Sequence, residues 1–475
     1  MSFLIRSGIE ILASHPKLYW NDHSKPGSEW ARFTKKEMPK DKLYDTLDEE
    51  EDYSSIVSMP GHENLGLGRH WHFLNVIFWV LTGVVYVALL FLSGEWKRLV
   101  PQSWAIFPTA WDNVVTYLNF RVPPLLPGQP YNALQKLTYG AVVFLLGPFM
   151  IATGAAQSPA IEARFPWFVR MFGGRQWARS LHFLAMLAFI LFTVGHVALV
   201  VIEKKMATIV QGSEQASLFW AYVISGVALV GIVALHWATT KYSLAYPRST
   251  QRLTGAVVNN ARKLLLHRLT SHQEYSRAEL TPDHRVNGKP PSDDSYKIMA
   301  VNNFEDWRLE VGGLVERPIT FTLEDLRTFP TKQSQRVLHN CIQGWTSIGE
   351  WSGVPLRQIV ELVKPLPQAR YVCFWTMQYV DRDEPAKADL PGQYYEVIDL
   401  SLAYHPQTIL AYEMNGGPLP LKHGAPLRLR VETQVGFKMA KWIERIEFLD
   451  DYSQIGQGMG GWREDNVYYD KEGEI

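Results

Sequence analysis

The stretch "SLHFLAMLAFILFTVGHVALVV", Ser180–Val201, is largely apolar and contains no Asp, Glu, Lys or Arg. An α-helix needs about 20 such residues to cross the hydrocarbon core of a bilayer. Four stretches of about this length lack Asp, Glu, Lys and Arg: Phe73–Leu92, Leu137–Ala156, Leu181–Ile202 and Leu218–Trp237. The alternative is four buried helices of a soluble protein, but charge-free stretches rarely follow one another in soluble folds. The sequence therefore predicts a four-helix transmembrane domain.

Two histidines, His182 and His196, lie within the third stretch. Their spacing of 14 residues is close to four helical turns, which places both side chains on one face, about 21 Å apart along the axis. This geometry suits two haems stacked across a bilayer, because neutral imidazole is a good iron ligand. His70 and His72 lie at the start of the first stretch, and His236 ends the fourth. Hydrogen-bonded interfacial histidines are the alternative, and for His236 the two interpretations weigh equally.

The membrane topology follows from the number of crossings and from the basic residues. Four crossings return the chain to its starting side, and the short 157–180 loop contains Arg164, Arg170, Arg175 and Arg179. By the positive-inside rule this loop and both chain ends are expected to be cytoplasmic. The N-terminal "MSFLIRSGIEILASHPK" has neither a secretory pattern nor a twin arginine. We therefore expect a multi-pass protein of the inner (cell) membrane, in contact with the lipid bilayer, whose C-terminal domain is cytoplasmic.

Composition excludes some classes of function. The formal net charge is zero, so no bulk electrostatic attraction favours nucleic acid. The 17 Trp residues suit membrane interfaces and cofactor pockets. Cys341 and Cys373 are the two cysteines and cannot build a disulfide framework, which fits a reducing compartment.

The chain divides by composition into five parts. A multidomain protein is expected, in which an all-α transmembrane bundle precedes an α+β domain. The strand-like stretches "WRLEVGGLV", "ARYVCFWTM" and "PLRLRVETQ" and the helix-like stretches "PLRQIVELV" and "TLEDLRTF" indicate the α+β class. The expected boundaries are 1–65 for a polar N-terminal segment, 66–240 for the membrane domain, 241–295 for a linker, 296–450 for the α+β domain and 451–475 for a tail.

Cys341 lies in the stretch "HNCIQGWTSIGEWSGVPL". No second cysteine stands at the spacing of a zinc or iron–sulfur site, and no nearby pattern indicates a cysteine protease. A buried cysteine is often only a small apolar side chain. A single thiolate can also be the one protein ligand of a metal that an organic cofactor otherwise holds.

The membrane domain resembles the bacterial cytochrome b561 and hydrogenase cytochrome b group. The matching residues are Arg69–His72, Thr82–Gly83 and the His182/His196 pair. The resemblance implies haem b, with His182 paired to His70 or His72. In that group the second helix often supplies another histidine, but here Leu137–Ala156 has none, so a second haem at His196 lacks a visible partner. One or two haems are expected, with His236 as a further possible ligand.

The C-terminal domain resembles the sulfite oxidase family of molybdenum enzymes, and within it the methionine sulfoxide reductase catalytic subunits. The motifs that carry the resemblance are "HNCIQGWTSIGEW", "VNNF", "NGGPLPLKHGAPLRLRV" and "GFKMAKWI". It implies that Cys341 is catalytic and binds the molybdenum of a molybdopterin cofactor, whereas Cys373 in "YVCFW" is expected to be structural. The cofactor-binding positions that it implies are Asn302, Glu305, Asp306, Thr376, His423, Arg428, Lys438, Met439, Ala440 and Lys441.

The sequence departs from the sulfite oxidase branch beside the cysteine. That branch has sulfite-binding arginines where this chain has Ile342, Gln343, Gly344 and Trp345. A buried anion without a compensating charge is unfavourable, which favours a neutral substrate such as a sulfoxide or N-oxide. Other basic residues could still reach the pocket: Arg336, Arg370 or Arg382. The immunoglobulin-like domain that follows in the sulfite oxidases is not expected here.

We therefore expect a membrane-bound molybdenum oxidoreductase that exchanges electrons between the quinone pool and a small oxo-substrate through haem b. Reduction of a sulfoxide or N-oxide is the favoured direction. A sulfite dehydrogenase that donates electrons to quinone is the first alternative. A non-catalytic electron-transfer cytochrome, or a redox sensor that uses the Cys341 thiol, would contain no molybdenum.

Overall fold

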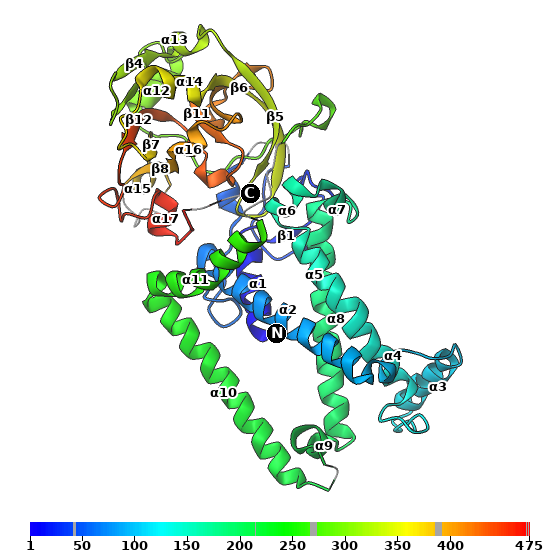
Figure 1. Cartoon of the computed structure of the whole chain (residues 1–475). Coiled ribbons are helices and arrows are strands. Elements are labelled where there is room, and N and C mark those ends of the chain that lie inside the picture. Colours follow the sequence, from blue (N-terminus) through cyan, green and yellow to red (C-terminus); the bar gives the residue numbers. More distant parts are fainter. Residues whose placement is uncertain (41–43, 214, 267–272, 385–391, 472, 474) are drawn as a thin grey trace.

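The computed structural model describes residues 1–475 except 41–43, 214, 267–272, 385–391, 472 and 474 (Figure 1). Among the described residues, four long apolar helical segments can each span a membrane. They are α2 (Leu65–Ser93), α4 to α5 (Ala133–Ala155), α8 (Arg175–Ile202) and α10 (Leu218–Ala245). The prediction of four spans is confirmed.

The second span contains a change of helix type. Its first part, α4 (Ala133–Ala141), and its last part, α5 (Gly147–Ala155), flank a π-helical turn at Val142–Leu146. Pro148 follows directly and has no backbone N–H, so the regular hydrogen-bond pattern is interrupted here. This local widening separates the parts of the span that contact His196 and His182, described below.

The N-terminal segment is folded rather than extended. Helix α1 (Ser2–Ala13) packs along α2 and is followed by the short strands β1 (Lys17–Leu18) and β2 (Ala31–Arg32) and the 3₁₀ turn η1 (Thr46–Glu49). The buried Glu10 carboxylate accepts hydrogen bonds from the backbone N–H groups of Gly61 (3.0 Å) and Asn64 (2.7 Å). These groups lie just before α2, so one side chain joins α1 to the start of the first span.

Connecting helices lie at both ends of the membrane bundle. At the end near the C-terminal domain are α6 (Pro159–Arg164), α7 (Pro166–Arg170) and α11 (Pro247–Leu266), together with the C terminus (Figure 1). At the other end are η2 (Glu95–Arg98), α3 (Ile106–Leu118) and α9 (Met206–Gln211). Trp104 and Phe120, which flank α3, are strongly exposed, as expected of a segment at a membrane interface. The 157–180 loop and the C-terminal domain therefore lie on the same side.

The described residues of the C-terminal domain form two five-stranded sheets. One has the strand order β10-β9-β6-β5, with β11 also paired to β9. The other has the order β4-β3-β12-β7-β8, and among its described strands the β3–β12 pair is parallel and the other pairs are antiparallel. The strands are β3 (Arg308–Gly313), β4 (Ile319–Thr322), β5 (Gln333–Asn340), β6 (Thr346–Pro355), β7 (Tyr371–Tyr379), β8 (Gln393–Asp399), β9 (Thr408–Met414), β10 (Gly417–Pro418), β11 (Arg428–Val431) and β12 (Ile443–Leu449).

Short helices connect and cover these sheets. They are α12 (Asp294–Val301), α13 (Leu323–Arg327), α14 (Leu356–Val363), α15 (Val380–Asp383), α16 (Leu400–Ala403), α17 (Trp462–Asn466) and the 3₁₀ turns η4 (Arg277–Glu279), η6 (Leu421–His423) and η7 (Gly436–Lys438). The predicted strands correspond to β3, β7 and β11, and the predicted helices to α13 and α14. The α+β class is therefore confirmed, with Cys373 fully buried in β7.

Candidate functional site

Cys341 lies in the loop that joins β5 to β6. The loop is closed by two backbone hydrogen bonds, from Cys341 N to Trp345 O and from Gly344 N to Cys341 O, both 3.1 Å. Gly344 has a φ of 103°, in the region that favours glycine because a side chain there would be strained. The loop holds the Cys341 side chain in a buried position, 5% exposed.

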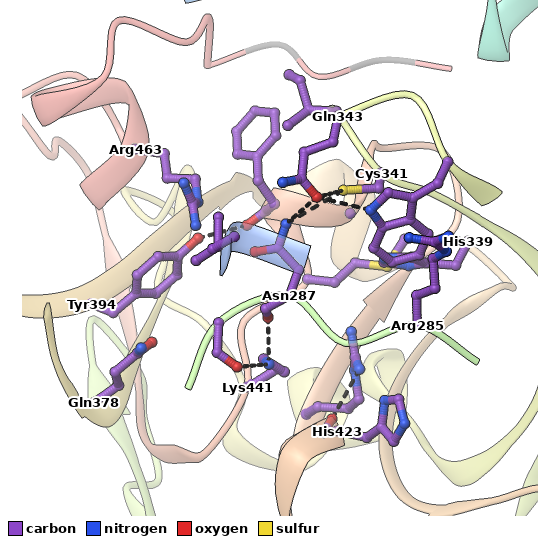
Figure 2. A pocket seen from close by; sticks show the side chains of 18 of the residues that line it. Arg285, Asn287, His339, Cys341, Gln343, Gln378, Tyr394, His423, Lys441 and Arg463 are labelled. Atoms are coloured by element: carbon purple, nitrogen blue, oxygen red, sulfur yellow. Dashed lines mark hydrogen bonds between the residues drawn. The ribbon is translucent and has the colours of Figure 1, made fainter. Parts of the chain in front are cut away.

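The cavity around Cys341 takes its wall from separate parts of the chain (Figure 2). Leu47 and Glu50 come from the N-terminal segment, and His284 to Gly288 precede α12. Lys441 follows β11, and Tyr469 follows α17. Residues on both sides of the expected boundaries at 65, 295 and 450 therefore line one cavity, although the boundaries themselves stay a prediction.

A polar network fixes the groups beside the thiol. Gln343 Oε1 accepts hydrogen bonds from Thr46 Oγ1 (2.8 Å), Asn287 Nδ2 (3.0 Å) and Trp345 Nε1 (2.8 Å). Asn287 Nδ2 is also 3.5 Å from Cys341 Sγ. Burial raises the pKa of the Cys341 thiol to about 11, so the protein alone keeps it neutral near pH 7. A coordinated metal ion would instead favour the thiolate.

The opposite wall is positively charged. Arg428 is buried over the Trp351 ring, 4.6 Å from its centroid, and within the described part of the chain its Nε has no hydrogen-bond partner. Lys441 Nζ donates to the carbonyl oxygens of Asn287 (2.6 Å) and Lys422 (3.1 Å). Burial and the charge of Arg428 lower the pKa of Lys441 to about 7. An anion placed here would be stabilised by this charge and by the open donor on Arg428.

Five of the residues predicted for the molybdopterin site line this cavity: Cys341, His423, Arg428, Met439 and Lys441. Gly424 and Gly436 permit the close packing, because a Cβ at Gly424 would come within 2.9 Å of the Lys441 side chain and one at Gly436 would collide with His339.

The other predicted cofactor residues lie elsewhere. Thr376 is buried in β7, where its hydroxyl donates to Tyr394 O (2.7 Å). Lys438 is buried in ion pairs with two glutamates, and Ala440 O accepts from Leu429 N (2.8 Å). The remaining three, Asn302, Glu305 and Asp306, lie around the C-terminal end of α12, outside the cavity, and their role stays a prediction.

Several cavity residues were not predicted from the sequence. Asn287 and His284 lie in the expected linker, and Arg463 and Tyr469 lie in the expected tail. Tyr394 comes from β8. The pattern "HRVNGKPP" around Asn287 has no hydrophobic period, and a single sequence gives no signal for contacts that only the tertiary structure creates.

Two histidines of the membrane domain have the same environment. His72 in α2 has its Nδ1 3.1 Å from Ser7 Oγ, and His182 in α8 has its Nδ1 3.2 Å from Thr153 Oγ1. The two helices are neighbours, because the rings of Trp79 in α2 and Phe189 in α8 meet edge to face with their centroids 6.0 Å apart. A hydroxyl on Nδ1 orients the ring and leaves Nε2 as the nitrogen for iron. The donor set therefore fits haem b between α2 and α8.

His196 has a similar contact, whereas His70 and His236 differ from this pair. His196 Nδ1 lies 3.2 Å from the hydroxyl of Tyr139 in α4. His70 Nε2 lies 3.2 Å from Asp470 Oδ2, in the C-terminal tail. Both ring nitrogens of His236 are hydrogen-bonded, to Ser2 Oγ and to Arg6 Nη1, each at 2.8 Å. Of the two alternatives for the His182 partner we propose His72, because its Nδ1 contacts a hydroxyl as that of His182 does.

The Cys341 loop contacts the membrane domain directly. Arg175 Nη1 donates to Asn340 Oδ1 (2.6 Å), and Gln176 Nε2 donates to Gly344 O (3.0 Å). Arg175 and Gln176 begin α8, and His182 follows in the same helix about 10 Å further along the axis. One buried and one part-buried hydrogen bond thus join the Cys341 loop to the helix that contains His182.

Two family models match the chain. Residues 296–455 match the oxidoreductase molybdopterin-binding domain, and residues 3–211 match prokaryotic cytochrome b561. A protein-methionine-sulfoxide reductase catalytic subunit, MsrP, of Campylobacter jejuni is 31% identical over 210 residues, which are 41% of this chain and 69% of the relative. The chain belongs to the molybdopterin-binding oxidoreductases.

Other relatives of this oxidoreductase are covered less completely. A protein of Azospira oryzae, named as a candidate protein-methionine-sulfoxide reductase subunit YedZ1, is 35% identical over 162 residues, 34% of this chain and 54% of that protein. The MsrP catalytic subunit of Xanthomonas axonopodis is 32% identical over 158 residues, 33% of this chain and 49% of the relative. The oxidoreductase thus spans about half the length of these two relatives.

The oxidoreductase is an enzyme that combines a molybdopterin domain with a cytochrome b561 membrane domain, and its cofactors are molybdenum–molybdopterin and haem b. The buried thiol and the cationic wall fit the first cofactor, because molybdopterin has a phosphate and leaves the metal one protein ligand. The paired imidazoles fit the second. The identification as a membrane-bound molybdopterin-dependent oxidoreductase is confirmed.

Proposed function

We propose that this oxidoreductase reduces a small sulfoxide or N-oxide with electrons from quinol. Bound molybdenum would supply two-electron oxygen-atom exchange, and haem b would carry the electrons singly. Cys341 would be the protein ligand of the metal, and Arg428 and Lys441 would hold the phosphate of the pterin. His72 and His182 would hold one haem. His196, with Tyr139, is left as the candidate for a second.

The observation that carries the proposal is the contact between the Cys341 loop and α8. Arg175 binds Asn340, which directly precedes Cys341. Gln176 binds Gly344, which follows Cys341 by three positions. The contact is buried at Asn340 and part-buried at Gly344. A direct contact between the Cys341 loop and the helix that contains His182 supports electron transfer within one chain, without a soluble carrier.

The residues beside Cys341 support a neutral substrate. The side chains of Asn287, Gln343 and Trp345 present amide and indole groups and no charge. Of the described residues, the three arginines that could have entered the pocket make other bonds or face solvent. Arg336 pairs with Glu350, Arg382 pairs with Asp293 and Asp383, and Arg370 is exposed.

Besides Arg285 and Arg428, Arg463 lines the cavity, and its charge favours the alternative of sulfite oxidation. Arg463 is buried beside Tyr394 (Figure 2). Burial opposes its charge, but Tyr394, Tyr469 and Glu384 act in the other direction and raise its pKa. Because Glu384 also lines the cavity and offsets the charge of Arg463, we place sulfite second.

The proposal places the molybdopterin domain in the cytoplasm. It shares its side of the membrane with the 157–180 loop, whose arginines favour the cytoplasmic side. A reporter that is active only outside the cytoplasm, fused after Ile475, should therefore give no signal. A strong signal would invert the topology and leave the proposed chemistry unaffected.

The proposed function is tested with the purified holoenzyme in detergent. Metal analysis and a reduced-minus-oxidised spectrum should give molybdenum and haem b. The enzyme is then reduced with a quinol analogue and mixed separately with sulfoxides, N-oxides and sulfite. We expect the first two classes to reoxidise the haem. Reduction of the oxidised haem by sulfite, without any reoxidation by sulfoxides or N-oxides, would replace our proposal by a sulfite dehydrogenase.

A further inference from the structure

Lys438, predicted to bind the pterin phosphate, instead lies in a buried cluster behind the cavity. Its ammonium group is 2.7 Å from Glu396 Oε2, pairs with Glu464 Oε1, and donates to Gly460 O (3.2 Å). Glu396 and Glu464 are both fully buried. We call these three residues, Lys438, Glu396 and Glu464, the carboxylate pair with its lysine. All three donors of Lys438 are directed away from the cavity.

The charges of this cluster do not balance if every group is ionised. One ammonium faces two carboxylates, which would leave one uncompensated negative charge in the interior, and such a charge is strongly unfavourable. A Cβ at Gly461 would collide with Oε2 of both glutamates, so these two oxygens lie close together. Two carboxyl groups that share a site in this way retain one proton between them. Burial and the charge of Glu464 both raise the pKa of Glu396.

Tyr394 joins the cluster to the cavity. It stands two residues before Glu396 in β8, so both side chains lie on the same face of the strand. Its hydroxyl is 3.0 Å from Phe437 O and 3.1 Å from Glu396 Oε1. The single hydroxyl proton of Tyr394 can serve only one of these two acceptors at a time. When it goes to Phe437 O, which can only accept, the second bond is made if Glu396 donates, and Glu396 can donate only in its protonated form.

We propose that the carboxylate pair with its lysine stores a proton and that Tyr394 delivers it to the oxo-substrate in the cavity. This inference rests on the proposed function, because reduction consumes protons: R₂S=O + 2 e⁻ + 2 H⁺ gives R₂S + H₂O. The S–O bond breaks, both electrons come from quinol through haem b, and the oxygen leaves as water. Tyr394 gives its hydroxyl proton to this oxygen and takes the proton of Glu396; protons from solvent recharge the cluster one at a time.

The groups that face Glu396 set its protonation. They are Lys438 from η7, Glu464 from α17 and Tyr394 from β8 itself. Burial and the charge of Glu396 raise the pKa of Tyr394, and the charge of Arg463 from α17 acts against them. Tyr394 therefore gives up its proton only as it takes the proton of Glu396, so that no free phenolate is formed.

The first test does not depend on turnover. Infrared spectra of the protein, with and without cofactors, should show the C=O band of a buried protonated carboxyl that is lost in Glu396→Gln. The band should also be lost in Glu464→Gln, because each variant leaves one lysine facing one carboxylate. Absence of this band from the wild-type protein, or its persistence in both variants, would overturn the proposal.

The second test uses the matched pair Tyr394→Phe and Tyr395→Phe. Tyr395 is also buried and hydrogen-bonded to a carboxylate, Asp465, but it lies on the other face of β8. General acid catalysis contributes about 10² to 10⁴-fold, so Tyr394→Phe should lower kcat at least about 100-fold with KM unchanged. Tyr395→Phe should keep kcat. Equal kcat in the two variants would refute the relay.

If the wild-type enzyme reduces no sulfoxide or N-oxide, the proposed function fails, and the infrared bands still decide whether the shared proton exists.

Discussion

Replacement of Arg175 by Met should loosen the contact between the molybdopterin domain and the haem-bearing helix. The guanidinium is 5% exposed and donates to Asn340 Oδ1 at 2.6 Å and to Gln157 O at 3.1 Å. Methionine keeps most of the apolar stem but donates no hydrogen bond. A hydrogen bond from a charged group contributes about 1.5–3 kcal/mol, which corresponds to a roughly 10- to 100-fold weaker docking equilibrium.

Two measurements report on the loosened contact between the Cys341 loop and α8. Stopped-flow spectroscopy of quinol-reduced enzyme gives the rate at which substrate reoxidises the haem, and we expect this rate to fall. Amide hydrogen exchange measures how readily the loop opens. The amide hydrogens of Cys341 and Gly344 should exchange faster in Arg175→Met than in the wild-type enzyme. Substrate reduction by an artificial donor that reaches the molybdenum domain directly should change little. Arg170→Met, a substitution of an exposed arginine in the same loop, is the matched control.

If the haem of Arg175→Met is reoxidised by substrate at the wild-type rate, and Cys341 N and Gly344 N also exchange at the wild-type rates, the hydrogen bond to Asn340 does not hold the two domains together. The same loss in Arg170→Met would show that the effect comes from loop charge and not from the hydrogen bond to Asn340.

Three further predictions follow from the sites. Cys341→Ser should abolish turnover and keep the haem spectrum; full activity, measured with any accepted substrate, would remove the molybdenum-ligand assignment. His182→Ala should lower the haem-to-protein ratio, His236→Ala should not, and His196→Ala should remove about half of the haem only if a second haem is bound; an unchanged ratio in His182→Ala would show that another residue is the ligand. Burial raises the pKa of Glu162 to about 7, so the folded state binds more protons than the unfolded state between about pH 4.5 and 7, and stability falls as the pH rises through that window. Glu162→Gln should therefore raise Tm at pH 8 and change it little at pH 4.5; equal effects at the two pH values would contradict the assigned pKa.

The apolar spans and three of the strands could be predicted because their signals are local. A charge-free stretch of membrane length is visible in the sequence alone, and β3, β7 and β11 follow from Val, aromatic and alternating residues bounded by Gly and Pro. The choice between His70 and His72 could not be made in this way. Two residues of a helix that are two positions apart point in nearly opposite directions, so the choice depends on which face of α2 meets α8.

Lys438 illustrates a different limit. A basic residue next to Lys441 in "GFKMAKWI" reasonably predicts phosphate binding. In the structure, η7 and the turn after it direct Lys441 to the cavity and Lys438 to the two glutamates. Those glutamates lie 42 residues before and 26 residues after Lys438. No local sequence pattern predicts the ion pairs of Lys438 with glutamates so far away in the chain.

The segment that carries Arg463, Tyr469 and Asp470 has a consequence for the order of folding. Arg463 and Tyr469 form part of the wall around Cys341, and Asp470 contacts His70 at the start of α2. Leu47 and Glu50, which precede the first span, line the same cavity. The wall around the thiol is therefore complete only when the molybdopterin domain has docked on the membrane domain. A molybdopterin domain that folded alone would leave the cavity open on this side.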